Sequence, residues 1–395
     1  MGRHLARVPP EDPRPVRYGL VVNPVAGLGG RVGLKGSDGP DVQARARELG
    51  AVPRASERAA AALEELKARV GAAVVLTAAG PMGEDAVRAA GLEPDVRYTP
   101  DASDGPDRAD ASGTTAADTV AAARALARHV DLLLFAGGDG TARDVLDAVG
   151  ASVPVLGVPT GVKMHSAVFG VGPRAAGEVA ARVATTRAFT EAEVMDLDEE
   201  AVRSGRVSAR LYGHLLVPDV PVRVQQRKVG SSAADPYAVG GIAAELAGRV
   251  GAGQLVLGPG GTTRAVAAAL GVDVPVMGVN VLRDGRFFAA DVNAAELLRL
   301  VTDDDWTGGT WIAVTPIGGQ GFLLGRGNQQ IAPEVLRAVG PDRLLAVATE
   351  AKLAALGGRP LLLDTGDPGL DGVLAGYRTV ITGRGRTARY PVQGA

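Results

Sequence analysis

The sequence predicts an α/β protein in which an N-terminal domain with a parallel sheet is followed by a second, mixed α/β and β-rich domain. Three observations favour this fold class. Short apolar segments alternate with helical segments in the first half of the chain, and β-prone stretches appear after about residue 191. The chain has 395 residues, of which 46% are hydrophobic, and this is enough material for two cores.

The first half carries the alternation most clearly. Apolar strands are expected at 18–22, 72–77, 131–136 and 153–158, and helices at 56–70, 83–90 and 114–128. Strands that are apolar throughout and separated by helices form βαβ units, so the sheet should be parallel and covered on both faces. The polar, Gly- and Asp-rich residues 100–113 are expected to form a loop.

The domain boundary is predicted from a change in composition. Acidic residues gather at 191–200, and β-prone stretches follow at 210–217 and 222–226. The predicted parts of the chain are a flexible N-terminus (1–16), an α/β domain (17–190), a second mixed α/β domain (191–340) and a C-terminal segment that packs back on the first domain (341–395).

Composition excludes several classes of protein. The net charge is −2 and the pI about 6.2, whereas proteins that bind nucleic acid through bulk charge are strongly basic. With no Cys and four scattered His, disulfides, thiolate sites and a His-based metal cluster are not expected. No secretory leader and no apolar run of the ~18 residues needed to span a membrane is found, so we expect a cytoplasmic protein without a membrane partner.

An internal repeat links the two halves. Residues 134–158 align without gaps to residues 255–279, at an offset of 121, with 13 identities in 25 positions. Both copies show a strand pattern, a Gly-rich turn, a Thr, an Arg, a short helix and a Val-Pro-Val strand, which predicts a second βαβ unit at about 254–280. The carboxylates Asp139, Asp144 and Asp147 of the first copy become Gly260, Ala265 and Ala268, so only the first loop could also provide a base.

The first copy of the repeat contains the main catalytic candidate. Gly137, Gly138, Asp139, Gly140 and Thr141 lie where an apolar strand ends and a helix begins, the edge at which open α/β sheets bind ligands. Glycines allow a ligand to approach the backbone, Thr141 could cap the helix, and the helix N-terminus favours phosphate. Asp139 repels phosphate, so it suggests a base for a hydroxyl or a partner of phosphate-bound Mg²⁺. The alternative is an ordinary tight turn with Asp as turn former.

Further small-residue or basic loops follow other strands and could bind a nucleotide, although each could also be a plain surface loop or turn. The candidates in these loops are Asn23, Gly27, Arg31 and Lys35; Thr160, Gly161, Lys163 and His165; Thr262, Thr263 and Arg264; and Thr315, Gly318, Gly319 and Gln320. Arg143 and Asp144, on the helix that follows Thr141, are candidates as well.

Four separated motifs together resemble the ATP-NAD kinase/AcoX-like family, within the NAD kinase–diacylglycerol kinase superfamily. They are Asn23-Pro-Val-Ala-Gly27 with its Gly-rich continuation, Gly137-Gly-Asp-Gly-Thr141, Thr160-Gly-Val-Lys-Met-His165, and Thr315-Pro-Ile-Gly-Gly-Gln320 with Gly325-Arg-Gly-Asn-Gln-Gln330. The resemblance covers residues 17–383 and implies a Rossmann-like first domain of the NAD kinase/phosphofructokinase type. Gly319 stands where ordinary NAD kinases have Ser, and no Asn-Glu motif of theirs is found.

The resemblance implies ATP-dependent phosphorylation of the 2′-hydroxyl of NAD to give NADP. Asp139 would be the general base, Mg²⁺ would bridge the ATP phosphates, and Arg31, Lys35 or Arg143 would offset developing charge. Metal ligands from the chain itself and nucleic-acid partners are not expected, whereas a homo-oligomer is. Two alternatives remain open: a kinase of a lipid or another alcohol, and a non-catalytic nucleotide-binding accessory protein of acetoin catabolism.

Overall fold

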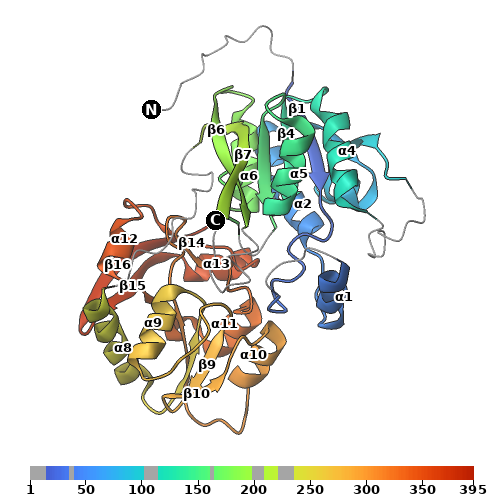
Figure 1. The fold of residues 1–395 in the computed structure, drawn as a ribbon. Helices are drawn as coiled ribbons and strands as arrows, with labels where there is room; N and C mark the ends of the chain where they lie inside the picture. Colours follow the sequence, from blue (N-terminus) through green and yellow to red (C-terminus); the bar gives the residue numbers. More distant parts are fainter. Residues whose placement is uncertain (1–14, 35–39, 102–113, 161–163, 198–208, 221–234) are drawn as a thin grey trace. The chain divides into compact units, whose positions relative to one another are not determined.

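A computed structural model describes residues 15–34, 40–101, 114–160, 164–197, 209–220 and 235–395 (Figure 1). The chain divides into two units. Unit 1 comprises residues 1–28 and 36–227, and unit 2 comprises residues 29–35 and 228–395. None of the helices in the described residues has the length and apolar character needed to cross a membrane.

Unit 1 is built on a five-stranded sheet of order β3-β2-β1-β4-β5 in which every pairing is parallel. Its elements are β1 (Arg17–Val22), α1 (Pro40–Glu48), α2 (Ala55–Val70), β2 (Val74–Ala78), η1 (Gly80–Met82), α3 (Glu84–Ala89), β3 (Pro94–Tyr98), α4 (Ala116–Ala127), β4 (Leu132–Gly137), α5 (Asp139–Val149), β5 (Val155–Pro159), α6 (Pro173–Arg182), β6 (Phe189–Leu197) and β7 (Ala209–Pro218). The predicted parallel, doubly covered sheet is confirmed. The predicted loop at 100–113 lies almost entirely outside the described residues.

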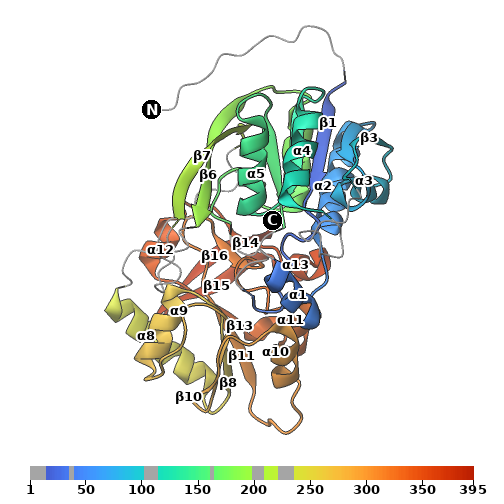
Figure 2. The same ribbon diagram turned by 45° about the vertical axis from the view of Figure 1, so that its right-hand side comes forward.

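Helices cover both faces of this sheet because alternate side chains of its central strands point to opposite sides (Figure 2). On β4, Leu132 and Leu134 join a core formed with α2 and α6, whereas Leu133 and Phe135 join a core formed with α4 and α5. Close approach of α2 and α6 depends on Gly177, since a Cβ there would lie 2.1 Å from the carbonyl oxygen of Ala62.

The β6–β7 hairpin belongs to unit 1, although the sequence analysis places the domain boundary at 191. The two strands pair antiparallel with each other. Ala192, Val194, Leu215 and Val217 are buried in the same core as Phe135. Burial of these apolar side chains against the first sheet assigns the hairpin to unit 1 and corrects that boundary.

Unit 2 contains a nine-stranded mixed sheet of order β10-β9-β8-β11-β13-β15-β16-β14-β12. Its elements are α8 (Pro236–Val250), β8 (Gln254–Leu257), α9 (Gly261–Ala269), β9 (Asn280–Arg283), β10 (Arg286–Ala289), α10 (Ala294–Val301), β11 (Thr310–Val314), β12 (Phe322–Leu324), α11 (Pro333–Val339), η2 (Pro341–Arg343), β13 (Leu344–Val347), α12 (Glu350–Ala354), β14 (Leu361–Leu363), α13 (Pro368–Leu374), β15 (Gly376–Gly383) and β16 (Arg386–Gly394). The predicted mixed, strand-rich second domain is confirmed.

The C-terminal segment 341–395, which the sequence analysis sets apart from the second domain, contributes four strands to this sheet. β13 pairs with β11 and β15, and β15 pairs with β16. The backbone groups of β13 need partners, and β11 of the same unit provides them. The separation at residue 341 is therefore corrected.

The internal repeat is structural only in its first part. In both copies a strand runs into a Gly-rich turn and a helix, β4–α5 in unit 1 and β8–α9 in unit 2. The predicted βαβ unit at 254–280 is wrong, because the second Val-Pro-Val segment, 274–276, forms no strand. The chain instead turns back and enters β9, which pairs antiparallel with β8.

Candidate active site

The edge of the first sheet has the geometry of a ligand site. The order 3-2-1-4-5 reverses direction between β1 and β4, and open α/β sheets bind ligands outside the carboxyl ends of the strands at such a switch point. Asn23 follows β1 there, and Gly138 and Asp139 follow β4. The Asn23 amide Nδ2 donates to Thr141 Oγ1 at 3.0 Å, which ties the two strand ends together.

The turn at the end of β4 is compact. A Cβ at Gly137 would lie 2.3 Å from the Thr141 side chain, so only glycine fits there. The backbone N–H of Thr160, after β5, donates to the Gly137 carbonyl at 3.0 Å. Gly27, in the turn after β1, has φ +79°. These contacts bring residues from three predicted loops to one edge of the sheet.

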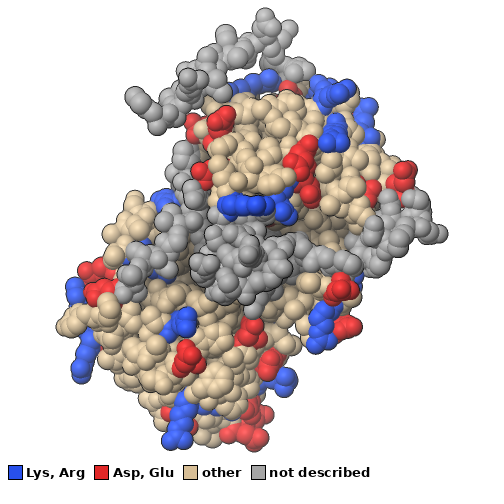
Figure 3. All heavy atoms as spheres, viewed as in Figure 1, with Lys and Arg blue, Asp and Glu red and all other residues tan. Residues whose placement is uncertain are grey.

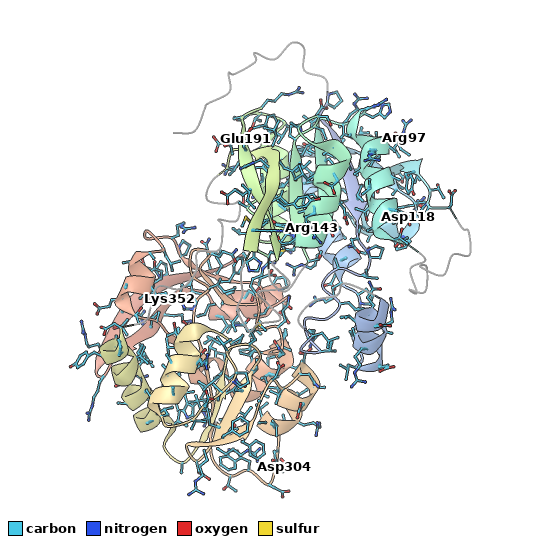
Figure 4. The ribbon with its side chains drawn as sticks, viewed as in Figure 1. Arg97, Asp118, Arg143, Glu191, Asp304 and Lys352 are labelled. Carbon is cyan, nitrogen blue, oxygen red and sulfur yellow. The ribbon has the colours of Figure 1, made fainter. Side chains whose placement is uncertain are left out.

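The predicted capping role of Thr141 is wrong. Helix α5 begins at Asp139, with Gly138 in an extended conformation as N-cap, so Thr141 lies inside the first turn. Its hydroxyl accepts a hydrogen bond from Asn23 and is buried. Gly140 is part of the same turn. Arg143 (labelled in Figure 4) and Asp144 follow as half-buried residues on α5.

The Asp139 carboxylate is directed at the segment that follows β5. Its Oδ2 accepts from the backbone N–H of His165 at 2.7 Å, and its Oδ1 accepts from the backbone N–H of Ser166 at 3.0 Å. The Nδ1 atom of the His165 ring lies 3.3 Å from Oδ2. The Asp139 side chain is 12% exposed and that of His165 7%. Asp139 therefore holds the segment bearing His165 against the start of α5.

Two polar atoms at this edge are buried without a hydrogen-bond partner among the described residues. They are Thr160 Oγ1 and His165 Nε2. Most buried polar atoms in proteins are paired, so such atoms need an explanation.

The predicted residues do not all gather here. Arg31 belongs to unit 2, where its guanidinium contacts Glu334 at 2.6 Å and its carbonyl accepts from Ala294 N–H. The guanidinium that was expected to contact phosphate thus forms an ion pair with Glu334 in this structure. Lys35, Gly161 and Lys163 lie outside the described residues.

Unit 2 carries a second group of candidate residues at the carboxyl ends of its parallel strands β8, β11 and β13. Lys352 lies on α12 (Figure 4). Its ammonium donates to Thr315 Oγ1 at 2.9 Å and to Thr262 Oγ1 at 3.2 Å. Thr315 follows β11, and Thr262 lies in the first turn of α9. A lysine that links two hydroxyls at a helix N-terminus places positive charge where the helix dipole already favours anions.

Other predicted residues of unit 2 lie in the same loops. The Thr263 hydroxyl donates to the Gly260 carbonyl at 3.0 Å, and Arg264 is an exposed residue 3.8 Å from Asp273. Gly319 has φ +79°, and its carbonyl accepts from Arg359. Gly318 is half-buried and Gln320 is buried.

Sequence reasoning missed Lys352. The residue lies in no Gly-rich motif, but one signal was available. It follows the strand β13 closely, three residues after Thr349, whose hydroxyl accepts from the Lys352 N–H at 3.3 Å. Lys is also rare in this chain, so each lysine beside a strand end was a candidate.

Surface charge is mixed on the face seen in Figure 3, where Lys and Arg are interspersed with Asp and Glu over the described residues. This distribution agrees with the small net charge of −2.

Comparison with known protein families finds two matching domains in the chain. Residues 18–188 match the ATP-NAD kinase N-terminal domain, and residues 253–392 match the ATP-NAD kinase C-terminal domain. Both domains of one family are therefore matched, in the order in which the two units follow along the chain. The chain belongs to the ATP-NAD kinase family.

No curated protein matches the chain. Among solved structures, it is similar to a candidate diacylglycerol kinase from Bacillus anthracis str. Sterne, with 13% identity and a TM-score of 0.21. The match covers 64% of this chain and spans 55% of the length of that structure.

Proposed function

We propose that the protein transfers the γ-phosphoryl group of ATP to the 2′-hydroxyl of NAD and so forms NADP. The observation that carries this proposal is the position of Asp139, in a Gly-Gly-Asp-Gly-Thr turn at the switch point of a parallel sheet, within a chain of the ATP-NAD kinase family. A hydroxyl becomes a good nucleophile only when a base removes its proton as the new bond forms. Asp139 is the residue on which this proton removal depends.

Geometry in unit 1 supports an acceptor site at this edge. The buried atoms Thr160 Oγ1 and His165 Nε2 can pair with polar groups of a ligand, such as ribose hydroxyls. Arg143 lies one turn along α5 from Asp139. The same turn therefore offers both hydrogen-bonding groups and a cation.

Geometry in unit 2 supports binding of anionic phosphates. Lys352, Thr262 and Thr315 form one hydrogen-bonded group at the N-terminus of α9. An ammonium, two hydroxyls and the N-terminus of a helix together suit a phosphate. We assign this group, with Thr263 and the loop 315–320, to the phosphates of a nucleotide substrate.

Mg²⁺ enters this proposal as part of the MgATP substrate. Phosphate oxygens and water provide most ligands of Mg²⁺ in kinases, so the chain needs to contribute few. Within the described residues no three His, Cys, Asp or Glu residues gather as metal ligands.

The proposal is tested by incubating the purified full-length protein with ATP and MgCl₂ and either NAD or NADH. The expected product is NADP or NADPH together with one ADP per turnover, quantified by chromatography. A protein that consumes ATP only with a lipid or another alcohol is a kinase of a different acceptor. A protein that binds NAD or ATP in calorimetry without turnover is a non-catalytic accessory protein. Either result would refute the proposed reaction.

A further inference from the structure

The starting observation is the unpaired Nε2 of His165. This histidine is 5% exposed, and its Nε2 is buried without a hydrogen-bond partner in the part of the chain that the structure describes. An unpaired buried polar atom is destabilising, and a hydroxyl that donates a hydrogen bond to it would remove that cost. His165 lies at the sheet edge where open α/β sheets bind ligands, beside the start of α5.

The ring's tautomer follows from its neighbour. An ionised carboxylate can only accept hydrogen bonds, so the Nδ1 atom that lies 3.3 Å from Asp139 Oδ2 carries the proton. In a neutral imidazole the other nitrogen is then a bare acceptor. Nε2 is thus held ready to receive a proton, and the Asp139 carboxylate is placed to stabilise the imidazolium that results.

The carboxylate of Asp139 is less suited to receive the proton itself. Both of its oxygens already accept a backbone N–H, at 2.7 and 3.0 Å. Proton transfer to either oxygen would compete with the hydrogen bond that this oxygen already accepts, whereas Nε2 of His165 has no partner among the described residues.

We propose that His165 Nε2 is the proton acceptor of the phosphoryl transfer and that Asp139 is its positioning residue. This inference rests on the proposed function. The acceptor hydroxyl oxygen attacks the γ-phosphorus, the new O–P bond forms, and the bond from the γ-phosphorus to the β,γ-bridging oxygen breaks to release ADP. The hydroxyl proton moves to Nε2, and the imidazolium later releases it to water.

The decisive variant is His165→Asn. The asparagine amide can keep the donor that faces Asp139, where Nδ1 lies, but it has no atom equivalent to Nε2. NADP formation should fall ~10²–10⁴-fold in kcat, the usual contribution of a general base, while the unfolding temperature and the affinity for NAD stay near wild type. His165→Gln, which offers a non-basic acceptor, should be as slow. The exposed His129→Asn is the matched control and should keep full activity.

Outcomes separate this inference from the proposed function. If the wild-type protein forms no NADP from ATP and NAD, the proposed reaction fails and this inference falls with it. If the wild type forms NADP and His165→Asn keeps kcat within about threefold, His165 is not the proton acceptor, and only the inference is overturned. If both His165 variants lose kcat but bind NAD normally, the assignment stands.

Discussion

The backbone N–H of His165 donates a 2.7 Å hydrogen bond to Asp139 Oδ2, across the gap between the start of α5 and the segment after β5. A second bond of 3.0 Å joins Ser166 N–H to the other carboxylate oxygen. One side chain therefore links the Gly-rich turn to a second loop of the sheet edge. The carboxylate is both a structural tie and a group on which the proposed chemistry depends.

Replacing Asp139 by Asn should separate these two roles. The asparagine amide keeps an oxygen for one N–H but no negative charge, so it cannot stabilise a protonated imidazole. We expect kcat for NADP formation to fall ~10²–10⁴-fold while KM for NAD changes little. Steady-state kinetics and a thermal melt measure the two effects.

Asp147→Asn is the control for that variant, since Asp147 lies on the same helix, is exposed and accepts from the Tyr212 hydroxyl at 2.9 Å. It should keep wild-type kinetics. Wild-type turnover by the Asp139→Asn variant would show that the proposed transfer does not depend on this carboxylate.

Lys352→Met should weaken the group formed with Thr262 and Thr315. Loss of a charged hydrogen-bond donor to a phosphate costs about 1.5–3 kcal/mol, so Kd for ATP should rise ~10–100-fold with a smaller change in unfolding temperature. Isothermal titration with MgATP measures this. Lys67→Met, which removes an exposed lysine of α2 that donates to Gly91, should leave the affinity unchanged. Equal affinity in the Lys352 variant would rule out the assigned role.

The buried ion pair of Arg326 and Asp364 in unit 2 should be costly to break. The two side chains are 3% and 8% exposed and lie 3.1 Å apart, and the guanidinium lies 4.8 Å from the centre of the Phe322 ring. Arg326→Met leaves a buried carboxylate without this partner, so the free energy of unfolding should drop by about 3–5 kcal/mol.

Urea titration followed by Trp fluorescence reports on unit 2, because both tryptophans, Trp306 and Trp311, belong to it. The double variant Arg326→Met/Asp364→Leu should lose less than the single Arg326 variant. A double variant that loses the sum of both single changes would mean that the two charges do not stabilise each other.

Ionisation of Tyr18 should make the stability of unit 1 depend on pH in the alkaline range. Burial, with a smaller contribution from the charge of Asp131, raises the pKa of the Tyr18 hydroxyl to about 12. The folded state therefore retains this proton when the unfolded state, with a pKa near 10, has lost it. The resulting stabilisation is complete below pH 10 and is lost as the pH rises through 12, by up to about 2–3 kcal/mol.

Tyr18→Phe should remove this dependence, since Phe has no proton to lose. Chemical denaturation followed by far-ultraviolet circular dichroism at pH 9, 10 and 11 compares the two proteins. The wild type should lose more stability than the variant above pH 10. Parallel losses would contradict the raised pKa.

The sequence alone predicted a parallel sheet, four of its five strands and the position of the Gly-rich turn, but not β3. Apolar strands such as 131–136 and the Thr-capped helix after residue 114 are local signals, and α4 indeed begins with a capping box at Thr115. The sequence alone could not predict the backbone conformation of residues 274–279. Their Val-Pro-Val pattern matches that of β5, yet residues 274–276 form no strand. The chain instead enters β9, which pairs antiparallel with β8, and such pairing is decided by the tertiary structure.

The sequence by itself shows which residue types stand near the strand ends. They are Asp139 among glycines and threonines at 141, 262 and 315. Which of these meet was decided by the tertiary structure, because hydrogen bonds between loops depend on strand order and not on spacing along the chain. Thr141 and Thr262 are equivalent in the repeat, yet one accepts from Asn23 and the other from Lys352, 90 residues away. Packing of three loops at one sheet edge likewise turned Asp139 toward His165 and left Nε2 buried without a partner among the described residues.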